Sequence, residues 1–319
     1  MIRRLAILAL ALAMTISVVW LLVTPQTLAA LKDALVNADW RPLGFAFVLS
    51  AVVQWLRAWR FAVMTTATLG LPGRRIIRIA FQLNFFNFAL PFRLGELSYP
   101  ILMRRAFGQP LLRSTGILLA ARLLDLTSVT AVLLAAAATL GLAGNAGGNL
   151  LLAAGSIACV MAPAIFTLAI GRHGKGALKS PFLAGIAGRL APGFTEPHKK
   201  SVRLLALALS YAIWLTFAVL AMLCANAVTD GISPAVALLG AAASNLAFAL
   251  PVNGIAGLGP SQAAWVLAVT RTGVPWESAV VSAMALYAVT LCGAIIFGGI
   301  ATLSETKWRA DSASRPDTR

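Results

Sequence analysis

A few charged side chains within otherwise apolar segments are the residues most able to do chemistry in this sequence. Arg122 and Asp125 lie three residues apart, so on a helix their side chains share one face and can form an ion pair. Arg93 and Glu96 have the same spacing, and Glu96 is the only acidic residue among residues 65–113. Ionisable groups are costly inside a membrane and are usually paired or functional there. They indicate the binding of an anionic group by arginine, with the carboxylates holding the arginines in place.

Two further arginines, Arg57 and Arg60, lie in the last third of an apolar segment over residues 43–64. Their spacing of three residues places them on one helix face. One interpretation is that they reach the cytoplasmic interface, where Trp55 and Trp59 serve as interfacial aromatic residues. The other is that Arg60 contacts a phosphate inside the membrane, together with the two arginines described above. The sequence leaves both interpretations open.

The composition indicates which structure must position these residues. Of 319 residues, 60% are hydrophobic and 11% are charged, whereas soluble domains carry about 25% charged residues. A chain of this size cannot hide so much apolar surface as a soluble globule, and the apolar fraction is too high for an outer-membrane barrel. The sequence predicts an all-α polytopic membrane protein with about six transmembrane helices, over residues 5–23, 43–64, 114–140, 149–170, 204–228 and 277–303.

Two apolar stretches, residues 76–108 and 233–271, are interrupted by proline and glycine. The interruptions cover residues 90–96 and 250–260, and each remaining half is short for a bilayer crossing. Proline and glycine leave main-chain groups unpaired, which at membrane depth requires burial in protein or a wet cavity. We therefore expect two re-entrant helical hairpins. Kinks in ordinary bundle helices are the alternative.

A repeated word connects the two interruptions. The sequence FALP occurs at residues 88–91 and again at 248–251, a shift of 160 residues that also superimposes two later spans on earlier ones. We predict a single transmembrane domain over residues 1–303, with inverted-topology repeats at about 5–140 and 149–303. Paired interrupted segments of this kind mark the substrate site of transporters. Candidate site residues in or beside the hairpins are Asn84, Pro91, Gly95, Asn245, Pro251, Gly257, Gly259 and Gln262.

The distribution of basic residues predicts the orientation. With a cytoplasmic N-terminus and two hairpins that do not cross, the cytoplasmic segments hold 20 Lys and Arg and the opposite segments hold three. This bias is typical of the positive-inside rule. Both termini, including a short basic tail over residues 304–319, are therefore expected in the cytoplasm. The net charge of +16 is explained in this way, and nucleic acid is not an expected partner.

The sequence carries none of the common motifs for hydrolysis or group transfer, such as HExxH, a P-loop or GxSxG. Its three cysteines and two histidines form no metal-ligand spacing. We therefore expect no cofactor and no metal. A transferase that uses a lipid-linked donor remains an alternative, with Glu96 as the candidate carboxylate.

These residues resemble the flippase-like transmembrane domain of lysylphosphatidylglycerol synthase over nearly all of residues 5–303. The resemblance rests on Arg60, Asn84, Pro91, Gly95-Glu96, Gly108, Arg122, Asp125, Leu250-Pro251 and Gly257-Leu258-Gly259. It implies a lipid translocator with inverted repeats and re-entrant helices. About 16 residues follow the last span, so the soluble synthase and its activity are expected to be absent. Gln262 stands where members of the family often carry Glu, which weakens the case for charge pairing at that position.

The predicted function is therefore a flippase or scramblase of the bacterial inner membrane that moves an anionic phospholipid or lipid-linked headgroup between leaflets. Membrane phospholipids are the expected partners. A homo-oligomer or a partner protein of envelope biosynthesis is also considered. A third alternative is a membrane protein that assists envelope-lipid or polysaccharide synthesis without transporting anything.

Overall fold

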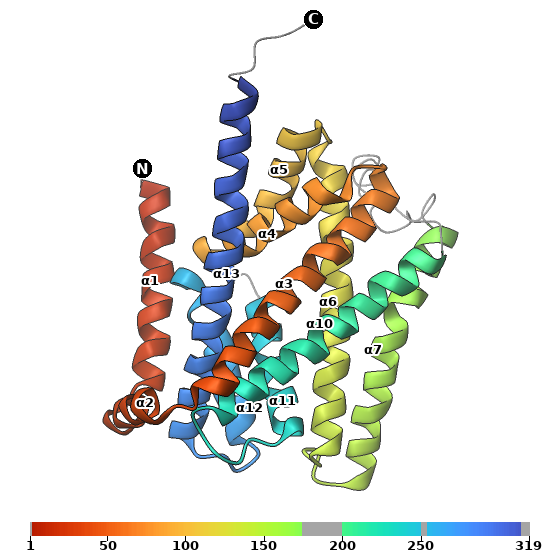
Figure 1. Cartoon of the computed structure of the whole chain (residues 1–319). Helices are drawn as coiled ribbons and strands as arrows, with labels where there is room; N and C mark the ends of the chain where they lie inside the picture. The colour runs from red at the N-terminus through yellow and green to blue at the C-terminus, as the bar shows by residue number, and fades with distance from the viewer. Residues whose placement is uncertain (1, 174–199, 250–253, 314–319) are drawn as a thin grey trace, which may run out of the picture.

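In the computed structural model, the described part of the chain covers residues 2–173, 200–249 and 254–313. This part is helical and contains no strand, as predicted. Its long helices run between two ends of the molecule (Figure 1). The elements are α1 (Ile2–Leu22), α2 (Pro25–Asn37), α3 (Trp40–Leu69), α4 (Gly73–Ala89), η1 (Pro91–Leu97), α5 (Ser98–Phe107), α6 (Leu111–Thr139), α7 (Ala146–His173), α10 (Lys200–Asn226), α11 (Pro234–Ala249), η2 (Ile255–Gly257), α12 (Pro260–Thr270) and α13 (Trp276–Ala313).

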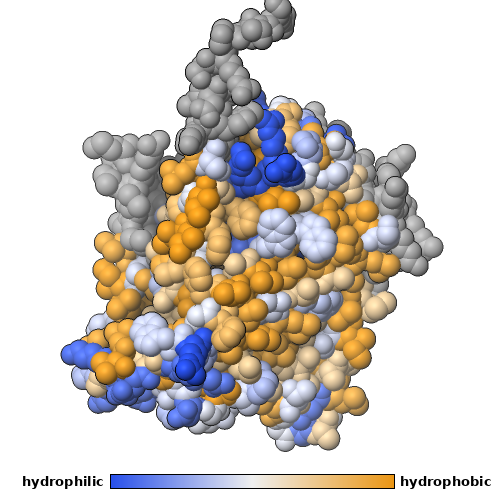
Figure 2. Space-filling model, in the orientation of Figure 1, coloured by the Kyte–Doolittle hydropathy of each residue, from blue (hydrophilic) through white to orange (hydrophobic). Residues whose placement is uncertain are grey.

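Within the described residues, five helices are long and apolar enough to cross a membrane, namely α3, α6, α7, α10 and α13. A sixth candidate is α1 together with α2, which bend by 87° at residues 23–24. Figure 2 shows a hydrophobic surface over the middle of the visible face, with hydrophilic patches toward its upper and lower ends. The chain is therefore a multi-pass helical membrane protein. The first residues of α1 and the last residues of α13 both lie on the upper side of the molecule in Figure 1.

Two helical segments go beyond the sequence prediction. α2 lies between the first two predicted spans, where no helix is predicted from the sequence. Thr24 caps it, since its hydroxyl accepts a hydrogen bond from the Thr27 amide at 3.2 Å, and Pro25 occupies the first turn, where its missing N–H costs nothing. At the other end of the chain, α13 continues to Ala313. The first part of the predicted basic tail over residues 304–319 is therefore helical and belongs to α13.

Both predicted hairpins appear as pairs of short helices joined by 3₁₀ segments. In the first hairpin, α4 starts and α5 ends toward the upper end of Figure 1. In the second hairpin, α11 starts and α12 ends toward the lower end. Phe92 and Arg93 of η1 and Ala256 of η2 have positive φ angles near 55°, a conformation that L-residues adopt only where the surroundings enforce it. Pro251 lies outside the described residues.

Gly95 explains how closely the first hairpin folds. A Cβ atom at this position would overlap the main chain of Phe86 and Asn87 in α4. Only glycine permits this approach of η1 to α4. Gly95 is therefore needed for packing, while its φ angle is not among the positive ones.

The helices of the two halves correspond under the shift of 160 residues. The shift moves α3 onto residues 200–229, where α10 covers Lys200–Asn226, and α4 onto 233–249, where α11 covers Pro234–Ala249. α3 and α10 pack together and run in opposite directions in Figure 1. These correspondences favour the inverted-repeat interpretation, which stays a prediction.

Candidate substrate site between the two hairpins

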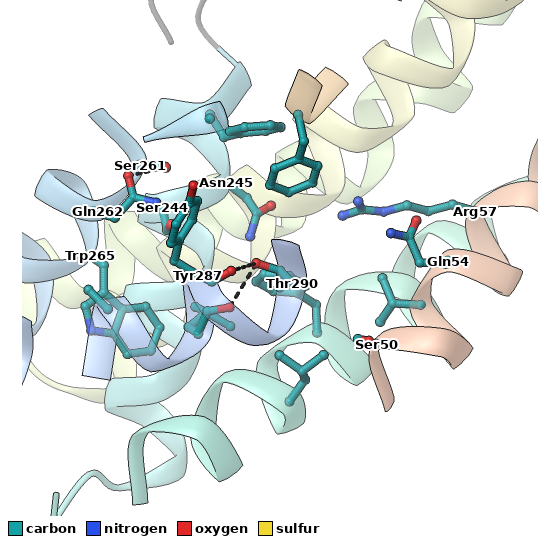
Figure 3. Close-up of a pocket in the computed structure, with 18 residues that line it drawn as sticks. Ser50, Gln54, Arg57, Ser244, Asn245, Ser261, Gln262, Trp265, Tyr287 and Thr290 are labelled. Carbon is teal, nitrogen blue, oxygen red and sulfur yellow. Dashed lines mark hydrogen bonds between the residues drawn. The ribbon is translucent and has the colours of Figure 1, made fainter. Parts of the chain in front are cut away.

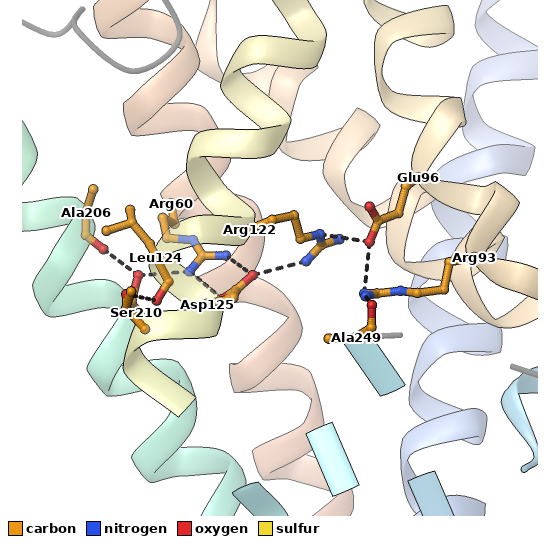
Figure 4. A network of polar contacts seen from close by, with 10 residues as sticks. Arg60, Arg93, Glu96, Arg122, Leu124, Asp125, Ala206, Ser210 and Ala249 are labelled. Atoms are coloured by element: carbon orange, nitrogen blue, oxygen red, sulfur yellow. Dashed lines mark hydrogen bonds and ion pairs between the residues drawn. The ribbon is translucent and has the colours of Figure 1, made fainter. Parts of the chain in front are cut away.

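The predicted charged residues form one continuous ladder of ion pairs, which we call the ion ladder (Figure 4). It runs from Arg60 to Asp125, Arg122, Glu96 and Arg93 in that order. Two guanidinium nitrogens of Arg60 donate to the two carboxylate oxygens of Asp125, at 2.7 and 2.9 Å. Arg122 donates to Asp125 at 3.0 Å and approaches Glu96 at 2.9 Å, and Arg93 approaches the same Glu96 oxygen at 2.9 Å.

Arg60 is the most deeply buried member of the ion ladder. Its side chain is 1% exposed, and one of its nitrogens also donates to the Ser210 hydroxyl at 2.8 Å. Ser210 belongs to α10 and in turn donates to the carbonyl of Ala206 at 2.8 Å. The Arg60 side chain therefore reaches neither solvent, as the interfacial interpretation requires, nor open space where a phosphate could contact it, because its charge is neutralised by Asp125 inside the protein.

Asp125 has a different main partner from the one that sequence spacing suggested. Arg122 does contact it, as the spacing of three residues predicts, but through one nitrogen. Arg60, 65 residues earlier, makes the bidentate contact, which is the stronger and more specific arrangement of the two.

The tips of the two hairpins meet at the end of the ion ladder. Arg93 donates to the carbonyl of Ala249 at 2.7 Å, and its guanidinium lies 5.2 Å from the ring centroid of Phe248. Phe88 and Phe248 contact each other with ring centroids 5.4 Å apart. These two residues occupy the same place in the repeated FALP word, so equivalent positions of the two halves pack against one another.

A cavity lies beside this contact, between α3 and the second hairpin (Figure 3). Its volume is about 70 Å³, which is room for several water molecules but too little for a lipid headgroup. Its walls come from six elements besides η2, and its polar groups are one guanidinium with hydroxyls and amides. They include Ser50, Gln54, Arg57, Ser244, Asn245, Ser261, Gln262, Tyr287 and Thr290.

Arg57 supplies the cation that faces this cavity. Its side chain points into the cavity in Figure 3, and its guanidinium lies 5.6 Å from the ring centroid of Trp214. Among the residues that the structure describes, no carboxylate forms an ion pair with Arg57. The ion ladder has three arginines and two carboxylates, so it carries a net charge of +1, and Arg57 raises the local total to +2.

The uncharged candidate residues have three kinds of surroundings. Asn245 and Gln262 line the cavity, as does Gly257, whose added Cβ would meet Phe88 at 3.2 Å and Phe248 at 3.3 Å. Asn84 is buried elsewhere in α4 and donates to Gln54 at 2.6 Å. The remaining candidates shape the main chain: Pro91 starts η1, Gly95 contacts α4, and Gly259 (φ 142°) donates its N–H to Gln262 at 2.8 Å.

Sequence reasoning missed several residues of this site. Gln54, Ser210 and Trp214 carried no local signal, because their roles depend on contacts with distant helices. Phe88 and Phe248 did carry one, since they stand in the repeated word, but this word was used only to align the halves. Tyr287 of α13, which donates to the carbonyl of Ala256 at 3.0 Å, was also missed.

The fold and the buried ion ladder define a polytopic membrane protein with a polar site between two hairpins. No group of three or more potential metal ligands occurs among the described residues. The sequence pattern of the family "Lysylphosphatidylglycerol synthase TM region" matches residues 6–298. The chain therefore belongs to this membrane-embedded, lipid-handling family, which confirms the resemblance seen in the sequence. No curated protein matches the chain.

Proposed function

We propose that the protein moves an anionic phospholipid or lipid-linked headgroup between the leaflets of the bacterial inner membrane, with both termini in the cytoplasm. The observation that carries this proposal is Arg57, a cation without a carboxylate partner among the described residues, facing a polar cavity at the meeting point of two hairpins. The planar guanidinium matches the geometry of a phosphate, and ionisable residues within a membrane commonly mark a substrate path.

The ion ladder supports this role by holding the surrounding cations in place. Asp125 and Glu96 together contact three arginines, so the excess positive charge is fixed in position before a lipid arrives. Preorganised charge of this kind lowers the cost of binding. The lipid would add the negative charge that the cluster lacks.

The small size of the cavity indicates a closed conformation. A headgroup enters only if the hairpin tips separate, which breaks the Arg93–Ala249 hydrogen bond and the Phe88–Phe248 contact. Translocation then follows from opening toward each side in turn, as expected for paired interrupted helices.

The same geometry argues against the transferase alternative. Glu96 was the candidate catalytic carboxylate, yet Arg93 and Arg122 both contact one of its oxygens at 2.9 Å. Glu96 is thus engaged in ion pairs within the protein and is not among the described residues that line the cavity. We accordingly propose that the chain is not an enzyme and that membrane phospholipids, not nucleic acid, are its partners, with a second copy of the chain or a protein of envelope biosynthesis as the protein partner.

The test is lipid translocation by purified protein in vesicles that contain fluorescent phosphatidylglycerol, with the outer leaflet bleached by dithionite. The Arg57→Gln variant is expected to translocate at least about tenfold more slowly, because a lost charged contact is worth 1.4 kcal/mol or more. Arg41→Gln, on the exposed start of the same helix, is the matched control and should keep the wild-type rate. Wild-type vesicles no faster than empty ones would overturn the proposal.

A further inference from the structure

The charges of the site all come from one half of the chain. Under the shift of 160 residues, Arg60 corresponds to Leu220, Arg122 to Ser282 and Asp125 to Ala285. The other charged members also have neutral counterparts: Arg57 corresponds to Phe217, Arg93 to Asn253 and Glu96 to Ala256. The repeat is symmetric in its helices and asymmetric in its charge.

This asymmetry gives the cavity two chemically different walls. On the α3 side stands the guanidinium of Arg57, and on the opposite side stand the amide of Asn245 and the hydroxyls of Tyr287 and Thr290 (Figure 3). No carboxylate occurs among the described residues that line the cavity. Tyr287 and Thr290 donate their hydroxyl hydrogens to main-chain carbonyls, and Asn245 donates one amide hydrogen to the carbonyl of Ala241. The wall opposite Arg57 therefore presents mainly uncharged oxygen acceptors, which can receive hydrogen bonds from hydroxyl groups but cannot neutralise a cation.

We infer that the site selects lipids whose phosphate carries an uncharged, hydroxylated headgroup and discriminates against lipids whose phosphate carries an ammonium. This inference rests on the proposed function, since it assumes that a lipid headgroup enters this cavity. The phosphate is bound by Arg57, and the hydroxyl groups of a glycerol or sugar-like headgroup are bound by the amide and hydroxyl wall.

The physical basis is the cost of an unpaired charge away from water. An ammonium a few bonds from the phosphate would lie in a region with a local charge of +2 and no available carboxylate, because both nearby carboxylates are held by arginines. Burying a cation without a partner costs far more than burying a hydroxyl that finds hydrogen bonds. Glycerol and sugar-like headgroups are both uncharged and hydroxylated. Binding measurements with one lipid of each kind are needed to show which headgroup the site prefers.

The test measures equilibrium binding of three short-chain lipids to the purified full-length chain in detergent. Phosphatidylglycerol and phosphatidylinositol represent the small and the ring-shaped uncharged headgroups, and phosphatidylethanolamine carries the ammonium on the same phosphate. The expected result is a Kd for phosphatidylethanolamine at least about tenfold higher than for the better of the other two lipids. Whichever of those two binds more tightly identifies the source of the hydroxyl groups.

A charge introduced into the uncharged wall gives the sharper comparison. Asn245→Asp places a carboxylate opposite Arg57 and should reduce the preference against phosphatidylethanolamine by at least about tenfold. Asn145→Asp makes the same chemical change in the exposed loop before α7, where the side-chain oxygen accepts from Gly148, and should leave the preference unchanged.

Two results would overturn the inference. One is wild-type protein that binds phosphatidylethanolamine as tightly as the other lipids, and the other is a folded Asn245→Asp variant with an unchanged preference. If the protein translocates lipids in vesicles but binds phosphatidylethanolamine as tightly as the other two lipids, the inference fails and the proposed function stands. If the protein binds the lipids selectively but does not translocate them, the proposed function fails and the inference about headgroup selectivity stands. If none of the three lipids binds, both fail.

Discussion

Removing Asp125 should destabilise the protein through Arg60 rather than through Arg122. Arg60 is 1% exposed and donates twice to Asp125, so Asp125→Leu leaves a buried guanidinium without its carboxylate. The loss of one partner from a buried pair costs about 3–5 kcal/mol. Since folded domains are stable by only about 5–15 kcal/mol, this is a large part of the free energy of unfolding.

Two double variants distinguish the partners of Asp125. Arg60→Leu/Asp125→Leu removes both members of the bidentate pair, and replacing a buried pair by apolar residues is often neutral or stabilising. Arg122→Leu/Asp125→Leu removes the pair that the sequence spacing suggested but keeps Arg60 unpaired, so it should remain about 3–5 kcal/mol less stable than wild type. Denaturant titrations in detergent, followed by far-UV circular dichroism, measure both.

The coupling energy between Arg60 and Asp125 should be at least about 2 kcal/mol in a double-mutant cycle. The reasoning is refuted if the effects of Arg60→Leu and Asp125→Leu simply add, or if the Arg122→Leu/Asp125→Leu variant is as stable as wild type. Arg57→Leu is a useful reference, because Arg57 has no carboxylate partner among the described residues and its removal orphans no acid.

Three further predictions concern the hairpins and the topology. Gly95→Ala should lower the free energy of unfolding by about 1–3 kcal/mol or more, because its Cβ overlaps the α4 main chain, whereas Gly299→Ala meets nothing within 4 Å; equal effects in unfolding titrations would contradict this. Arg93→Gln loses the hydrogen bond to the opposite hairpin, so a cysteine at position 245 should react faster with a small water-soluble thiol reagent, and an unchanged rate would show that this contact does not keep the cavity closed. A cysteine at position 271, with the native cysteines replaced, should be labelled from the periplasmic side, and labelling only from the cytoplasm would exclude the predicted orientation.

Much of the fold could be predicted because hydropathy and helix interruptions are local signals. The long apolar segments gave the spans, and the proline and glycine clusters gave both hairpins. α2 was missed because it is short and mixed in character, although Thr24-Pro25 is a helix start that could have been recognised. The end of α13 was missed because its charged residues are typical of a segment outside the membrane. Such residues are compatible with a helix, so α13 continues beyond its apolar part.

The site could be predicted only where its contacts are local. The spacing of three residues within one helix or turn correctly suggested that Arg122 meets Asp125 and that Arg93 meets Glu96. The contacts that join these pairs, from Arg60 to Asp125 and from Arg122 to Glu96, connect separate elements. Their existence depends on how helices pack, and no rule of spacing reports that.

The distance along the chain between Arg60 and its carboxylate has a consequence for how the protein enters the membrane. The two residues are separated by 65 positions, so at about 5–20 residues per second of synthesis α3 is complete several seconds before α6 exists. A lone arginine within a span costs about 2.5–3.5 kcal/mol to insert through the translocon. We therefore expect α3 to remain beside the translocon, or shallow in the interface, until Asp125 is synthesised. The segment made during this wait is the predicted first hairpin, and we expect α3, the hairpin and α6 to be released into the bilayer as one unit.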